Sequence, residues 1–108
     1  MVRDMDIQAY MRKDGTVPFR VWLDGLRDRG ARARIRIRLD RVRLGNLGDH
    51  RALGGGLYEL RIAYGPGYRV YFALMEQTIV LLLAGGDKGS QRNDIATARS
   101  YWHDFRAQ

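Results

Sequence analysis

The feature that most constrains the fold is a pair of alternating segments around a glycine-rich loop, YELRIAYGPGYRVYF at positions 58–72. The loop contains a Pro-Gly dipeptide, which is typical of turns. Closing it places Ile62 opposite Tyr68, so that apolar and aromatic side chains pair along one face of a hairpin. A shift of one residue would pair these side chains with charged ones. The pattern therefore predicts an antiparallel hairpin of strands 57–62 and 68–75 in this register.

The other face of the predicted hairpin is polar. In the same register Arg61 lies across from Arg69, and Glu59 lies across from Tyr71. Two arginines placed directly opposite each other repel, which costs stability. Either Glu59 and solvent screen this repulsion, or the pair binds an anion such as a phosphate. Lys88 is expected near the hairpin tip as a third cation, beside a helix start whose N–H groups also favour anions.

A third strand is predicted at residues 78–84, because an unbroken apolar run is typical of a central strand buried on both faces. A turn at residues 76–77 would align Ala84 beside Arg69 and leave room above that arginine. The glycine-rich residues 85–89 are expected to end the strand.

The remaining segments complete an α+β domain in the order strand, two helices, three antiparallel strands and helix. Residues 6–13 alternate weakly, as in a strand. Thr16 can cap a helix that has Pro18 in its first turn, and Ser90 can cap the last helix. Residues 45–56 contain many glycines and are predicted to form a loop.

Residues 31–44, ARARIRIRLDRVRL, fit two structures. Their alternation indicates a strand, but the same residues also form one apolar face at helical spacing. The absence of turn signals and the good helix formers favour a helix. In either structure the arginines, Arg36 and Arg43 among them, form a dense positive surface. This surface is either solvated or a track for nucleic-acid phosphates.

Charge and composition limit the function. The 108 residues carry a net charge of +7 and suffice for one domain, residues 1–108. A strongly basic chain favours nucleic acid or an acidic protein as partner. The chain has no cysteine, and His50 and His103 have no partner at metal-ligand spacing, so neither a metal nor another cofactor is expected. No segment has the apolar length of a membrane span, which favours a cytoplasmic protein without membrane contact.

The ELR, GPGYRVYF and GGDK runs between residues 57 and 102 resemble the addiction-module killer family of RelE/HigB-like toxins. The WLDGL run at residues 22–26 and the helix after it fit as well. The resemblance implies a RelE/ParE-like fold, with two N-terminal helices and a C-terminal helix packed on a small antiparallel sheet. It also implies the toxin of a type II toxin–antitoxin pair that cleaves mRNA, usually on the ribosome. Its partner would be a helix-turn-helix antitoxin, and operator DNA would be bound only through their complex.

Cleavage without a metal would use the 2′-hydroxyl of the RNA as nucleophile. Arg61, Arg69 and Lys88 suit the stabilisation of charge on the phosphate, and Lys88 could also transfer a proton. Glu59 could be the general base or only a counter-ion, and Tyr71 could donate a proton or stack. The predicted RNA contacts are aromatic side chains for bases and arginines for phosphates: Tyr64, Tyr68, Arg92, Arg36 and Arg43. Antitoxin docking is a third use for the arginine-rich helix.

Three other functions fit the same sequence. A ParE-like protein would inhibit DNA gyrase and cut no RNA, since a fold alone does not decide function. A non-catalytic nucleic-acid-binding module would bind in a salt-sensitive manner without a cleaved product. A regulatory subunit would act only with an antitoxin, as an operator co-repressor. Mapping of RNA ends separates the nuclease from all three.

Overall fold

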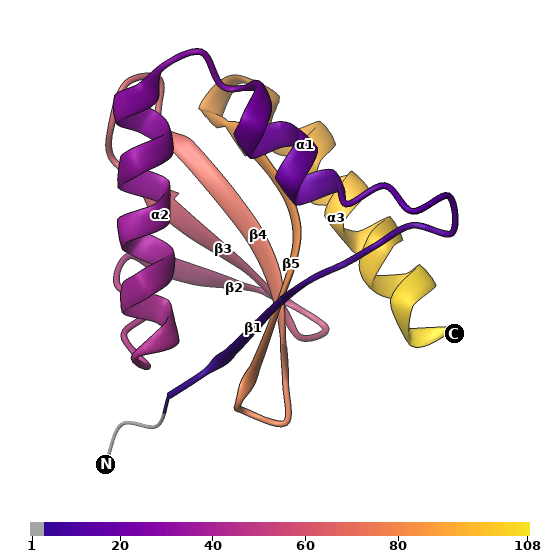
Figure 1. The fold of residues 1–108 in the computed structure, drawn as a ribbon. Coiled ribbons are helices and arrows are strands. Elements are labelled where there is room, and N and C mark those ends of the chain that lie inside the picture. Colours follow the sequence, from indigo (N-terminus) through magenta and orange to yellow (C-terminus); the bar gives the residue numbers. More distant parts are fainter. Residues whose placement is uncertain (1–3) are drawn as a thin grey trace.

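The structure is a computed structural model that describes residues 4–108, and it has the predicted α+β class (Figure 1). Its elements in chain order are β1 (Asp6–Ala9), α1 (Pro18–Gly25), α2 (Arg29–Arg43), β2 (His50–Gly54), β3 (Leu57–Ile62), β4 (Tyr68–Met75), β5 (Ile79–Asp87), the short 3-10 helix η1 (Lys88–Ser90) and α3 (Gln91–Arg106). The sheet order is β1-β5-β4-β3-β2. The sheet is mixed rather than antiparallel throughout, because β1 runs parallel to β5.

The two faces of the sheet are covered by different helices. Helices α1 and α2 pack on one face, and α3 packs on the other (Figure 1). Apolar side chains at alternate positions of β3 and β4, such as Leu60 and Phe72, contribute to the core under α1 and α2. Tyr71 and Leu83 contribute to the core under α3. Within the described residues, no helix is long and apolar enough to cross a membrane.

The predicted hairpin register is confirmed. Ile62 pairs with Tyr68, Arg61 with Arg69, and Glu59 with Tyr71. The alternating pattern determines this register, since a shift by one residue would exchange the core and polar faces of the hairpin.

Two expectations about the neighbouring strands are wrong. The loop predicted at residues 45–56 contains β2, which pairs with β3 and forms an edge of the sheet. Strand β5 does not end at residue 84 but continues through its glycines to Asp87. A register shift between Tyr71 and Phe72 then places Gly86, rather than Ala84, beside Arg69. Such a bulge inserts an extra residue into one strand, and a simple hairpin count from the turn does not include it.

Gly85 and Gly86 let both helix layers approach the same end of β5. A Cβ atom on Gly85 would overlap the ring of Trp22 in α1, and one on Gly86 would overlap the carboxylate of Asp94 in α3. The sequence predicted free space above Arg69, next to Ala84. Gly86 is the residue beside Arg69 instead, and the carboxylate of Asp94 fills the space over Gly86.

Substitution Gly85→Ala is expected to lower the free energy of unfolding by about 1–3 kcal/mol, the usual cost of overpacking. Guanidinium denaturation of the native protein and the variant measures this change. Gly25→Ala is the matched control, because a Cβ there meets no atom within 4 Å. Equal losses in both variants would show that contact with Trp22 is not the cause.

Of the two caps predicted from sequence, Ser90 occupies the N-cap position of its helix, and Thr16 does not. The arginine-rich segment is helical, as favoured, and Asp28 caps α2 by accepting from the N–H groups of Gly30 (2.8 Å) and Ala31 (3.2 Å). Thr16 does not cap α1; its own N–H donates to Asp14 in the preceding turn. Ser90 holds the N-cap position of α3 without a side-chain cap bond.

Tyr10, a buried tyrosine directly after β1, contacts the C-terminal half of α3. The ring of Tyr10 stacks on Tyr101, with centroids 5.0 Å apart, and its hydroxyl donates to Asp104. Burial and the contact with Asp104 raise the pKa of Tyr10 from 10.0 to about 12. Because the folded-state pKa is raised, this group stabilises the fold below its unfolded pKa, and the stabilisation is lost as the pH rises toward 12.

We expect Tyr10→Phe to remove part of the alkaline loss of stability. The free energy of unfolding of the native protein should fall more steeply than that of the variant between about pH 10 and about pH 12. Denaturation curves of both proteins at pH values across this window measure the difference. Parallel curves would show that Tyr10 titrates normally in the folded protein.

Candidate functional site

Two arginines lie side by side on the α3 face of the sheet. Arg61 of β3 is paired directly with Arg69 of β4, and the Nε atoms of both are buried without a hydrogen-bond partner. Arg61 forms an ion pair with Asp49 at 2.9 Å. Within residues 4–108, Arg69 has no carboxylate at ion-pair distance. On the α3 side, the carboxylate of Asp94 lies over Gly86, the residue paired with Arg69 across the strands.

Lys88 lies at the same end of the sheet. It is exposed and begins η1, directly after the end of β5. A Cβ atom placed on Gly67, in the β3–β4 turn, would be 3.7 Å from Cβ of Lys88 and 3.9 Å from Nη1 of Arg69. Lys88 and Arg69 therefore both lie beside this turn glycine.

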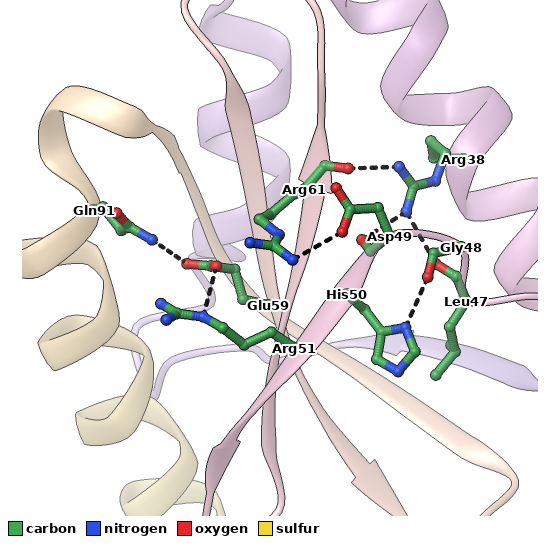
Figure 2. Close-up of polar contacts among 9 residues, drawn as sticks. All are labelled: Arg38, Leu47, Gly48, Asp49, His50, Arg51, Glu59, Arg61 and Gln91. Carbon is green, nitrogen blue, oxygen red and sulfur yellow. Dashed lines mark hydrogen bonds and ion pairs between the residues drawn. The ribbon is translucent and has the colours of Figure 1, made fainter.

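Glu59 has the geometry of a buried counter-ion rather than of a general base. Its side chain is fully buried and accepts from Nε of Arg51 at 3.2 Å and from Nε2 of Gln91 at 2.8 Å (Figure 2). These two bonds tie β3 to β2 and to the start of α3. A carboxylate without solvent contact and with both oxygens engaged is poorly placed to remove a proton from a substrate. Of the two roles predicted for Glu59, this geometry favours the counter-ion.

Tyr71 is also inaccessible. Its side chain is fully buried beneath α3, and its hydroxyl has no hydrogen-bond partner in the described structure. Burial and the nearby Glu59 carboxylate raise the pKa of Tyr71 well above its usual value. Burial and the raised pKa favour a structural role for Tyr71 over the predicted stacking or proton donation.

Of the tyrosines predicted to stack on RNA, only Tyr64 is partly exposed. Tyr68 is buried, its ring packs edge-on against Trp22 at 6.3 Å, and burial raises its pKa. This environment favours a core role for Tyr68 over the predicted contact with RNA. The Arg34 guanidinium lies 4.6 Å from the centroid of the Tyr64 ring, which leaves that ring only partly free.

The remaining predicted RNA contacts lie in different layers. Arg36 and Arg43 are exposed on α2, which covers the face opposite the arginine pair, and Arg43 lies 3.6 Å from Asp40. Arg92 is exposed in the first turn of α3, on the same face as the pair. The arginines of α2 are therefore not part of one continuous site with Arg61 and Arg69. Residues 4–108 also contain no group of three His, Cys, Asp or Glu side chains placed to hold a metal ion.

Arg38 supports the site from the other side of the sheet, a role that its sequence position did not reveal. Its guanidinium donates to the backbone oxygens of Arg61 (2.6 Å), Leu47 (2.9 Å) and Asp49 (3.1 Å) (Figure 2). Burial lowers the pKa of Arg38 below its usual value. One side chain of α2 thus fixes the backbone of Arg61 and the loop that carries its counter-ion.

Residues 21–102 match the family described as Phage derived protein Gp49-like (DUF891). The chain belongs to this Gp49-like family. The family is associated with toxin–antitoxin systems. An uncharacterized protein of Haemophilus influenzae is 43% identical to this Gp49-like chain over 84 residues, which cover 78% of the chain and 85% of that protein. The matched residues of the Gp49-like family include β3, β4 and η1, and therefore Arg61, Arg69 and Lys88.

Proposed function

We propose that this Gp49-like protein is the toxin of a type II toxin–antitoxin pair and that it cleaves mRNA at the site of Arg61 and Arg69. The observation that carries the proposal is the cross-strand arginine pair with two buried, unpartnered Nε atoms. A phosphate bound to the accessible parts of the two half-buried guanidinium groups would offset the repulsion between them. The family's association with toxin–antitoxin systems supports the role of toxin.

The reaction proposed is attack by the 2′-hydroxyl of a nucleotide on the adjacent phosphorus. A bond forms between O2′ and phosphorus while the bond from phosphorus to O5′ breaks. The 2′-hydroxyl loses a proton and the 5′-oxygen gains one, which leaves a 2′,3′-cyclic phosphate and a 5′-hydroxyl. Arg69, Arg61 and Lys88 would stabilise the negative charge that builds up on the phosphate oxygens, an effect that is largest when the donors are held in place beforehand.

The buried groups have a supporting role in this mechanism. Glu59 positions Arg51 and Gln91 rather than touching the substrate. Arg38 holds the backbone of Arg61. The partners proposed with this function are mRNA, the ribosome in the cytoplasm, and a cognate helix-turn-helix antitoxin whose complex binds operator DNA.

The proposal is tested by adding the purified protein to a defined cell-free translation reaction and mapping the 5′ ends of the mRNA. Translation should stop, and new 5′ ends should appear within the message. A DNA gyrase supercoiling assay runs in parallel. Arrested translation with intact mRNA, or inhibited supercoiling with intact mRNA, would contradict RNA cleavage.

A further inference from the structure

A hollow lies on the α2 side of the sheet, on the face opposite the arginine pair. Its volume is about 260 Å³, and it lies between α2 and the end of the β3–β4 hairpin. Its lining residues are Arg34, Ile37, Arg38, Arg41, Ile62, Ala63 and Tyr64. Apolar groups from β3 and the following turn form part of this groove, while three arginines of α2 surround them. The proposed nuclease mechanism uses none of this space.

Two large apolar side chains are exposed on this side of the chain: Ile37 lines the groove, and Leu44 is the C-cap residue of α2. Ile37 is 50% exposed and Leu44 is 62% exposed. Residues seven positions apart share one face of a helix, and Arg41 lies between these two on the same face. Large apolar side chains that remain in contact with water beside a hollow are typical of a protein interface.

We propose that this α2 groove binds an acidic, amphipathic helix of a partner protein. Apolar side chains of the partner would cover Ile37 and fill the space beside Ala63, and its carboxylates would pair with the exposed Arg34 and Arg41. This is the recognition of an amphipathic helix by a groove, with charge complementarity at the rim. The ring of Tyr64 already holds Arg34 in place at 4.6 Å, so less side-chain freedom is lost on binding.

The chemistry of the groove distinguishes this occupant from two others. RNA would neutralise the arginines, but its phosphates would leave Ile37 and Leu44 uncovered. A second copy of this chain, also with a net charge of +7, would be repelled. The inference rests on this surface alone and does not depend on RNA cleavage.

The test measures fluorescence anisotropy of a labelled synthetic helical peptide, with leucines along one face and glutamates on the other. A peptide of the same composition in scrambled order is the first control, and a single-stranded RNA is the competitor. We expect Ile37→Glu to weaken binding by at least about tenfold, as for an anchor residue of an interface. The double substitution of Arg34→Glu and Arg41→Glu should have a similar effect. Arg38 is left unchanged because it also supports Arg61.

Val21→Glu is the matched control, since Val21 is a 61% exposed apolar residue on α1 rather than α2. It should leave the peptide affinity unchanged. Circular dichroism melting curves establish that each variant is folded. The proposal is overturned if the scrambled peptide binds equally well, or if Val21→Glu weakens peptide binding as much as Ile37→Glu does. It is also overturned if the RNA displaces the peptide and if the Ile37→Glu substitution weakens the affinity of the protein for that RNA. Absence of peptide binding to the native protein would also overturn it.

Discussion

Replacement of Arg69 by alanine is expected to lower the rate of mRNA cleavage about 100- to 1000-fold, the usual loss when one preorganised donor to transition-state charge is removed. The free energy of unfolding should not fall, since Arg69 has no carboxylate partner among residues 4–108 and faces Arg61 across the strands. Single-turnover cleavage of a defined mRNA on purified ribosomes measures the rate. Guanidinium denaturation measures the stability.

Arg20→Ala is the control for this substitution. Arg20 is exposed on α1, in the helix layer on the opposite face of the sheet, and removing it changes the net charge by the same amount. The Arg20→Ala variant should cleave at the native rate. If Arg69→Ala also cleaved at the native rate, the reaction would take place somewhere other than the arginine pair.

The second large effect is expected on stability, when the buried Glu59 carboxylate loses its cationic partner. Arg51→Leu should lower the free energy of unfolding by about 3 kcal/mol, because it leaves the fully buried Glu59 without its cation. This value is at the lower end for a broken buried pair, since 46% of the Arg51 side chain is exposed. Gln91 alone would then donate to the Glu59 carboxylate.

The double variant of Arg51→Leu and Glu59→Leu should recover much of that stability. An apolar pair of similar volume removes the uncompensated charge, and such replacements are often neutral or stabilising. Denaturation of the two single variants and the double variant gives the coupling energy. A double variant no more stable than Arg51→Leu would show that the loss comes from packing rather than from charge.

The core of the sheet could be predicted from local pattern. Alternation around a Pro-Gly turn determined the pairing of Arg61 with Arg69, because any other register would bury charge against the helices. The helical structure of α2 was favoured over a strand because its segment has no turn signals and contains good helix formers. Asp28, whose side chain caps that helix, is the sequence signal that would have strengthened this choice.

The features that the sequence did not predict depend on contacts between segments far apart in the chain. Strand β2 forms in a glycine-rich segment because β3 offers an unpaired edge, and the segment itself has weak strand character. The sequence placed Glu59 and Tyr71 on the polar face of the hairpin, and in the structure both side chains are fully buried on the α3 side. Alternation shows which residues share a face; it does not show which helix covers that face. Arg51 and Gln91, the partners of Glu59, come from two other elements and could not be paired with it from sequence spacing.

The chemistry of the cleaved ends tests the central claim most directly. Native protein is added to translating ribosomes, and the new mRNA 5′ ends are assayed for ligation with and without prior phosphorylation by a kinase. Attack by the 2′-hydroxyl predicts 5′-hydroxyl ends, which ligate only after phosphorylation, and upstream fragments that carry a 2′,3′-cyclic phosphate. Ends that already carry a 5′-phosphate, or a message that stays intact while translation stops, would contradict the account.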